Sequence, residues 1–111
     1  MKISELKSCL QLEEIVVIDP EREVEGAYVG DLLSWVMTRL SANYAWITIM
    51  SNINAIAVAS LSDAACIIFT ENAEVSDDII SKAKQEGINL FKTNRSSFDV
   101  AYLMGKMLYE K

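Results

Sequence analysis

The sequence predicts a single three-layer α/β domain over residues 1–111, with a mainly parallel sheet of four or five strands and helices on both faces. Two observations support this prediction. Four apolar segments are each followed by a polar turn and a segment of helical periodicity, and strands connected in this way lie parallel. The apolar segments, such as CIIF at residues 66–69, are continuous rather than alternating, which is typical of strands buried on both faces.

Residues 1–25 precede the four repeated units. Apolar residues at helical spacing predict a first helix over about residues 3–12, with Ser4 as a candidate cap. The β-branched segment 14–18 (EIVVI) predicts a strand that ends at an Asp-Pro turn signal. The segment 20–26 (PEREVEG) is the most polar of the chain, and we interpret it as a solvated loop. An exposed sheet edge and a functional acidic patch are the alternatives.

Residues 26–111 contain the repeated strand–turn–helix units. The predicted strands cover residues 27–29, 45–50, 65–69 and 88–91. The predicted helices cover residues 32–40, 55–61, 76–86 and 97–109. Ser76 and Ser96 are expected to begin the last two helices, the second through a capping box with Asp99, and Gly87 is a stop signal.

The composition excludes several function classes. The net charge is −6 and the ten basic residues are scattered. This disfavours nucleic acid and anionic membrane surfaces as partners, because phosphate binding needs clustered cations. The chain has no His, and so it lacks the commonest general base and the commonest metal ligand. No catalytic residue, no metal site and no cofactor are therefore expected.

The amino terminus and the cysteines predict a cytoplasmic protein. The first ten residues, MKISELKSCL, carry charges where a signal peptide is apolar, and no apolar run approaches the roughly 20 residues that cross a bilayer. Cys9 and Cys66 are far apart in the sequence. We interpret them as two buried, reduced thiols rather than as a disulfide.

The polar loops after the strands form the candidate ligand site. In a parallel sheet these loops meet at one edge, where the helix starts also present free backbone N–H groups to anions. The candidate ligand-binding residues of these loops are Gly30, Asp31, Ser51, Asn52, Asn54, Thr70, Glu71, Asn72 and Arg95. We interpret Arg95 as the only cation at this edge. The alternative is that the same residues only cap helices and solvate turns.

Two further patterns limit the chemistry of this edge. The chain has no Gly-rich phosphate loop with its Lys and Ser/Thr, which disfavours a nucleoside triphosphate. The acidic run from Glu71 to Asp78 matches no calcium-binding loop, and a solvated helix start explains it better.

The last predicted helix carries more apolar residues than one buried stripe needs. The excess predicts self-association, with a homodimer as the expected assembly, and a different protein partner is also compatible. The candidate interface residues are Tyr102, Met104, Met107 and Leu108. The alternative is that a thin core uses both sides of the helix. The aromatic residues Trp35, Trp46, Tyr28 and Tyr44 are interpreted as core, or as interface if they lie on the surface.

Three segments resemble a DRTGG domain: GAYVGDLLSWVM, ITIMSNINAIAVASLSDAACIIFTEN and INLFKTNRSSFDVAYLM. This small α/β module occurs beside nucleotide-sensing CBS domains in some pyrophosphatases and within some phosphotransacetylase-type proteins. It is also similar to the amino-terminal domain of HPr kinase/phosphorylase. The resemblance covers about residues 26–105 and implies a regulatory or oligomer-forming module rather than a catalytic one.

The resemblance also implies equivalent loops. The Gly-Asp-Arg loop of the family corresponds to Ser51, Asn52 and the residues just after them, and its Thr-Gly-Gly loop corresponds to Thr70, Glu71 and Asn72. Only the Thr is retained. The Arg is lost and both glycines are replaced, one by a carboxylate, which hinders close approach of the backbone to an anion. Gly30-Asp31 agrees with the strand-to-helix turn of the family.

Three functional hypotheses follow. The first is a non-catalytic cytoplasmic regulatory or interaction module that self-associates and senses a small ligand at the carboxyl-end loops. The second is a sensor for a nucleotide or an acidic metabolite, with its pocket between residues 51–54 and 70–72. The third is an enzyme that uses Asp31 or Glu71 as a base with Arg95 as electrophilic support.

Overall fold

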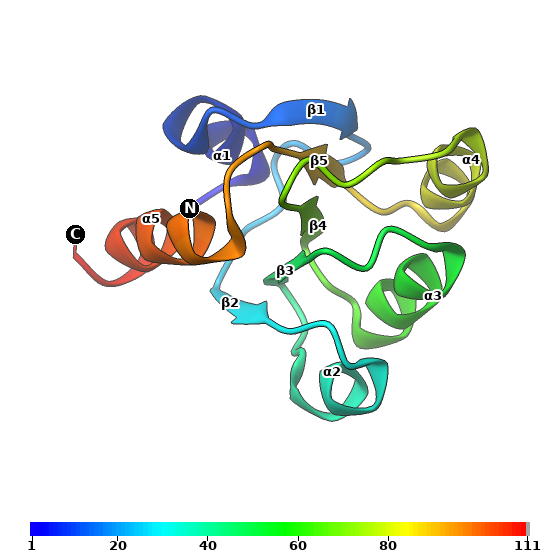
Figure 1. The fold of residues 1–111 in the computed structure, drawn as a ribbon. Helices are drawn as coiled ribbons and strands as arrows, with labels where there is room; N and C mark the ends of the chain where they lie inside the picture. The colour runs from blue at the N-terminus through cyan, green and yellow to red at the C-terminus, as the bar shows by residue number, and fades with distance from the viewer. Residues whose placement is uncertain (111) are drawn as a thin grey trace.

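A five-stranded sheet forms the middle layer of the fold, between two layers of helices (Figure 1). The computed structural model describes residues 1–110, so Lys111 of the predicted domain lies outside the described residues. In chain order the elements are α1 (Ile3–Leu10), β1 (Glu13–Val16), β2 (Gly26–Val29), α2 (Leu33–Arg39), β3 (Tyr44–Thr48), α3 (Ile53–Ser62), β4 (Cys66–Phe69), α4 (Asp77–Glu86), β5 (Leu90–Lys92) and α5 (Ser97–Tyr109). The predicted α/β class is confirmed.

The strand order is β1-β5-β4-β3-β2. Strands β2 to β5 are parallel, as predicted. Strand β1 runs antiparallel to β5, with Glu13 opposite Lys92, and an irregularity of register between Glu14 and Val16. The amino-terminal strand therefore closes one edge of the sheet, and the short strand β2 forms the other.

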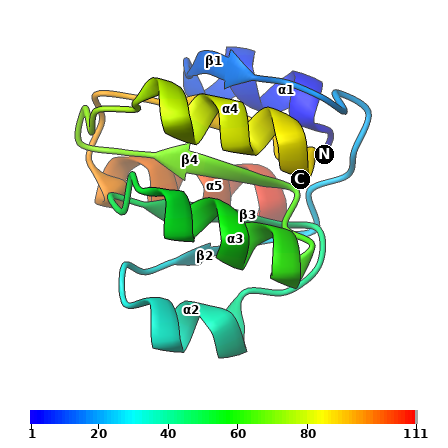
Figure 2. The same cartoon turned by 90° about the vertical axis from the view of Figure 1, so that its right-hand side faces the viewer.

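Each face of the sheet has its own core. Helices α2, α3 and α4 cover one face, and α1 and α5 cover the other (Figures 1 and 2). Side chains of the central strands alternate between the two cores, so Trp46 and Ile67 contact the first while Ile47 and Ile68 contact the second. This two-sided burial is the reason for the continuous apolar strands of the sequence.

The caps of α1, α4 and α5 agree with the sequence only in part, and of the predicted capping box of α5 the structure shows only the hydrogen bond that Ser96 accepts. The Ser96 side chain accepts a hydrogen bond from the Asp99 N–H at 3.0 Å, and Gly87 ends α4 with a φ of +71°. The Ser76 side chain occupies the cap position of α4 but makes no capping hydrogen bond. Ser4 lies inside α1, which begins one residue earlier with Lys2 at the cap. The prediction that Ser4 caps this helix is therefore wrong.

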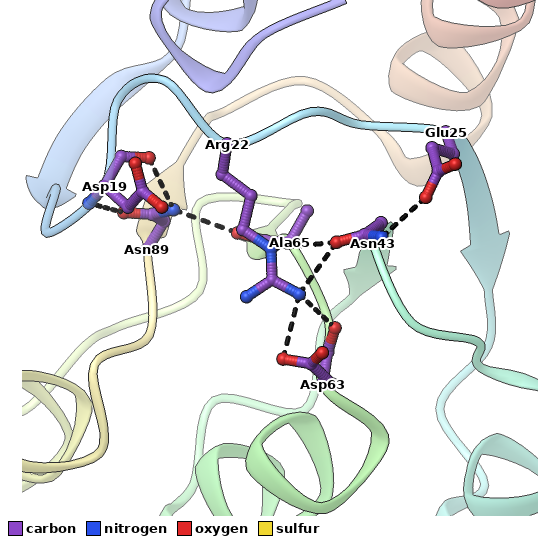
Figure 3. Close-up of polar contacts among 7 residues, drawn as sticks. All are labelled: Asp19, Arg22, Glu25, Asn43, Asp63, Ala65 and Asn89. Atoms are coloured by element: carbon purple, nitrogen blue, oxygen red, sulfur yellow. Dashed lines mark hydrogen bonds and ion pairs between the residues drawn. The ribbon is translucent and has the colours of Figure 1, made fainter.

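The loop between β1 and β2 is tied to the domain rather than simply solvated. Arg22 extends across the amino ends of the parallel strands, where Nε and Nη2 donate to Asn43 Oδ1 at 3.1 and 2.9 Å (Figure 3). Its Nη2 also lies 2.9 Å from the Asp63 carboxylate. Asn43 in turn donates to Glu25 at 2.6 Å. One cation thus joins three loops at this edge.

Asn89 fixes the same loop from the other side (Figure 3). Its side chain is 2% exposed and forms four hydrogen bonds. Oδ1 accepts from the N–H groups of Ile18 and Asp19, and Nδ2 donates to the carbonyl groups of Asp19 and Ala65. A buried amide with all its groups paired is a structural anchor. The amino edge of the sheet is therefore closed by hydrogen bonds.

The two cysteines differ in environment. Both thiols are free, and Cys66 is buried in β4 as predicted. Cys9 is exposed, so the prediction of two buried thiols is wrong for this residue. Helix α1 turns Ile3, Leu6 and Leu10 toward the sheet, and Cys9 lies outside that buried stripe. Burial raises the pKa of the Cys66 thiol to about 12, which leaves it un-ionised and unreactive.

Candidate functional site

The carboxyl edge of the sheet contains a pocket between β5, α4 and the loop after β3. The cavity measures about 560 Å³ and is lined by Ser51, Glu74, Val75, Ser76, Ile79 and Lys92. A second hollow of about 290 Å³ is lined by Gln11, Glu13, Asn72, Lys92, Thr93 and Asn94. Lys92 contributes to both cavities. It is a candidate site residue that the sequence analysis missed.

The position of Lys92 follows from the alternation of side chains along β5. Leu90 packs in the core beneath α4, and Phe91 packs in the opposite core. Lys92 is the next residue, so its side chain returns to the α4 side at the end of the strand. None of the four ion pairs among residues 1–110 includes this ammonium group. The prediction of Arg95 as the only cation at this edge is therefore wrong.

The amino end of α4 faces the same pocket. Ser76 and Ile79 line the cavity, and the Ser76 hydroxyl makes no cap bond to the first turn of the helix. The first backbone N–H groups of a helix carry partial positive charge, which adds to the charge of Lys92. Glu74 supplies a carboxylate in the same lining. The pocket can thus hold an anionic group and a hydrogen-bond donor of one ligand.

Arg95 and Asp31 do not come together at this edge. Arg95 Nη2 donates to Gln11 Oε1 at 2.9 Å, at the end of α1. Asp31 follows β2, which is separated from β5 by two strands, or about 14 Å across the sheet. Asp31 Oδ1 accepts from the Thr48 hydroxyl at 2.8 Å and from the Ile49 N–H at 3.0 Å. Its carboxylate therefore holds the end of β3 in place.

The family assignment follows from a comparison with protein-family models. The DRTGG domain model matches residues 5–107. The chain belongs to the DRTGG domain family. This confirms the resemblance seen in the sequence, and the matched region extends further toward the amino terminus than the segments that carried it.

A solved structure supports the fold of this DRTGG domain. It contains the CBS and DRTGG domains of the regulatory region of Clostridium perfringens pyrophosphatase, complexed with an activator, diadenosine tetraphosphate. The similarity has a TM-score of 0.71 at 17% identity and covers 93% of the present chain but 45% of the pyrophosphatase chain. The domain thus spans less than half of that regulatory region. No protein of curated function matches the sequence.

The Thr-Gly-Gly loop of the DRTGG domain has an unusual form here. Glu71 and Asn72 both adopt left-handed backbone conformations, with φ values of +58° and +56°. These conformations favour glycine, in agreement with the Thr-Gly-Gly loop that the family resemblance implies at these positions. Thr70 is fully buried, with its hydroxyl oxygen 2.6 Å from that of Ser97. The left-handed backbone at Glu71 and Asn72 is compatible with glycine at both positions.

Glu71 also changes the chemistry of this loop. Its carboxylate accepts a hydrogen bond from the Ser97 N–H at 3.3 Å, at the start of α5. The amino end of α5 is thus occupied by a carboxylate of the domain itself, whereas the amino end of α4 has no such partner from its cap residue. Helix α4 carries Asp77 and Asp78 in its first turn, so the cation of the larger cavity lining is Lys92.

The remaining predicted ligand residues lie as follows. Ser51 lines the larger cavity, and Asn72 lines the smaller one. Asn52 caps α3 by accepting from the Ala55 N–H at 3.2 Å. Asn54 is exposed in the first turn of α3, outside both linings. The Gly30 carbonyl accepts from Trp46 Nε1 at 2.9 Å, which is a structural contact.

The predicted interface residues of α5 also separate into two groups. Met104 is 1% exposed and belongs to the core, so its assignment to an interface is wrong. Met107 and Leu108 are partly buried and pack against that core. Tyr102 is 58% exposed, on the outer side of the helix.

Within residues 1–110, no group of three or more His, Cys, Asp or Glu side chains is arranged to hold a metal ion. None of the helices that the structure describes is long and apolar enough to span a membrane.

Proposed function

We propose that this DRTGG domain is a non-catalytic regulatory module that binds a small anionic ligand in the pocket between β5 and α4. The observation that supports the proposal is the position of Lys92, an ammonium group outside every ion pair of the described chain, in a cavity shared with the start of α4. A cation and a helix amino end together favour a phosphate or a carboxylate.

The ligand class proposed is a nucleotide or an acidic metabolite. A cavity of about 560 Å³ is within the size range of small-molecule sites. The Glu74 carboxylate repels a second anionic group but accepts hydrogen bonds from ribose hydroxyls or from an amino group. A nucleotide satisfies both requirements with one molecule. The nucleotide activator of the clostridial regulatory region supports this class by analogy.

Thermal unfolding tests the proposal directly. The full chain is heated with adenosine mono-, di- and triphosphate, with diadenosine tetraphosphate and with a series of dicarboxylic acids. At least one of these ligands is expected to raise Tm, because binding to the folded state stabilises it. Lys92→Gln is expected to remove the shift. Lys84→Gln is the matched control, since Lys84 lies exposed on the same helix as the pocket residues but outside the lining.

Two outcomes contradict the proposal. One is the absence of any shift over the whole ligand series. The other is a shift that persists unchanged in Lys92→Gln, which would place the ligand elsewhere. A non-catalytic role is preferred because Asp31 and Glu71, the candidate bases, are already engaged in hydrogen bonds that hold loops together.

Self-association in the cytoplasm is the second part of the proposal. Phe98, Tyr102 and Tyr109 of α5 are 77%, 58% and 79% exposed, which is unusual for three aromatic side chains on one helix. Sedimentation velocity over a range of protein concentrations tests it. A sedimentation coefficient that stays at the monomer value up to high micromolar concentration contradicts this part and leaves the ligand proposal intact.

A further inference from the structure

The outer face of α5 carries one continuous stripe. Its members follow each other at intervals of four, three and four residues, which aligns them along one side of a helix. The stripe consists of Phe98, Tyr102, Gly105 and Tyr109. The inner face is different, because Val100 and Met104 are buried against the sheet. The stripe therefore faces away from the core that α5 covers.

No contact or backbone conformation among the described residues requires a glycine at position 105. A Cβ atom built at this position meets no atom within 4 Å, and the backbone φ is not positive. Glycine inside a helix is less favourable than alanine, so this half-buried helical glycine with open space above it weakens α5. A side chain of a second helix that crosses at this point would fit into the open space above Gly105.

The stripe is complementary to itself when one copy is reversed. In an antiparallel pair centred between Leu103 and Met104, Tyr102 of each copy lies opposite Gly105 of the other. The large ring then enters the space above the glycine, as a knob enters a hole. Phe98 lies opposite Tyr109 in the same alignment, which gives one aromatic pair at each end. This arrangement has two-fold symmetry, the commonest symmetry of protein dimers.

The charges beside the stripe are complementary as well. Asp99 and Lys106 lie on one flank, both exposed, and neither takes part in an ion pair among residues 1–110. Antiparallel alignment brings Asp99 of one copy beside Lys106 of the other, and the symmetry repeats this contact. Ala101 and Leu108 form the other flank, which is partly buried and apolar. Size and charge thus select the same alignment.

We propose that α5 of this domain pairs antiparallel with α5 of a second copy, with Tyr102 packed over Gly105 of the partner. The proposal rests on the self-association included in the proposed function and assigns its geometry. The exposed parts of six aromatic side chains give on the order of 900 Å² of buried surface, since each complete side chain buries 150–250 Å². This area is at the small end of specific interfaces, so the dimer is expected to dissociate in the micromolar range.

A charge-exchange series measured by sedimentation equilibrium tests the pairing in the full chain. Asp99→Lys and Lys106→Asp each place like charges opposite one another, and each is expected to weaken dimerisation about tenfold. The double variant Asp99→Lys/Lys106→Asp restores opposite charges, and its dissociation constant is expected to return to within about threefold of the original. Near-ultraviolet circular dichroism verifies that every variant keeps its fold.

A second experiment locates the contact. In a Cys9→Ser background, Tyr102→Cys and Gly105→Cys variants are mixed and oxidised, and a disulfide between the two chains is expected. Leu61→Cys on α3 is the matched control, because Leu61 is 80% exposed and lies on the opposite side of the sheet.

The outcomes separate the two levels of the proposal. A wild-type chain that stays monomeric overturns both self-association and the pairing. A dimer that is unaffected by the charge series, or that links through position 61 as readily as through 102 and 105, overturns the α5 pairing and leaves self-association standing. Recovery in the double variant together with selective linking supports the pairing.

Discussion

Arg22 and Asp63 form an ion pair at 2.9 Å, although one residue belongs to the loop before β2 and the other ends α3. The same Arg22 nitrogen also donates to the Asp63 carbonyl oxygen at 2.6 Å. Asp63 adopts a left-handed conformation with a φ of +56°, and both its carbonyl oxygen and its carboxylate Oδ1 contact the guanidinium group. Arg22 thus binds the carbonyl and carboxylate oxygens of the residue that follows α3, and these contacts hold the loop before β2 in place.

Arg22→Gln is expected to lower the free energy of unfolding by about 1–3 kcal/mol, because the variant loses a charged donor with several acceptors. Urea denaturation gives the value. Lys2→Gln is the comparison, since the Lys2–Glu21 pair is exposed and its loss is expected to have a much smaller effect on stability. Equal effects of the two substitutions would show that Arg22 is an ordinary surface cation.

Asn89→Ala is expected to cost about 2–4 kcal/mol, since it leaves two N–H groups and two carbonyl groups without their side-chain partner beneath the loop. Asn94→Ala, at an exposed position beyond β5, is expected to change stability by less than about 0.5 kcal/mol. Hydrogen exchange at Ile18 and Asp19 provides a local measurement. Unchanged protection of these two amides in Asn89→Ala would contradict the assigned role.

The buried thiol of Cys66 is expected to lower the stability of the folded domain at alkaline pH. Burial, only partly opposed by the positive charge of Arg22, raises the pKa of this thiol from 9.0 to about 12 in the folded domain. The folded state therefore holds its proton where the unfolded state has lost it, and stability falls as the pH rises from about 9 to about 12. Cys66→Ala is expected to show a shallower decrease over this interval. Under native conditions a thiol reagent should modify only Cys9, and in denaturant both thiols.

The backbone and the side chain of Glu71 make contributions to stability that can be measured separately. Glu71→Ala loses the hydrogen bond to the Ser97 N–H and keeps a Cβ at positive φ, so we expect a loss of about 1 kcal/mol. Glu71→Gly loses the same hydrogen bond but relieves the left-handed backbone, and its loss is expected to be smaller by about 0.5–1 kcal/mol. Thermal denaturation compares the two variants. A glycine variant less stable than the alanine variant would contradict this account.

Much of the fold was predictable because local pattern and tertiary burial agree. The continuous apolar residues of β4 predict a strand buried on both sides, and both cores contain its side chains. The direction of β1 was not predictable, because it depends on pairing with β5 at the other end of the chain. Local patterns carry no information on a contact of that separation. The hydrogen bonds of Asn89 and Arg22 were not predictable for the same reason, because they join residues that are far apart in the sequence.

The candidate site was predictable only as an edge of the sheet. Ser51 follows a strand and lines the pocket, as expected for a residue in a loop at the carboxyl edge. Lys92 was missed because the predicted strand ended at Phe91. Continuing the alternation by one residue would have placed Lys92 on the α4 side. The direction of the Arg95 side chain depends on the geometry of a turn and on Gln11, which no spacing rule supplies. For α5, helical periodicity already separates Met104 from Tyr102, since Met104 shares a face with Val100.

The pairing of the first strand with the last has a consequence for synthesis of the protein. A nascent chain makes α1 and β1 first, yet β1 has no neighbour in the sheet until residues 90–92 have left the ribosome. Helix α1 likewise packs beside α5, which follows the other described helices in the sequence (Figure 1). The apolar face of α1 and β1 therefore stays exposed while most of the domain is translated. Chaperones are expected to bind to this face of the nascent chain.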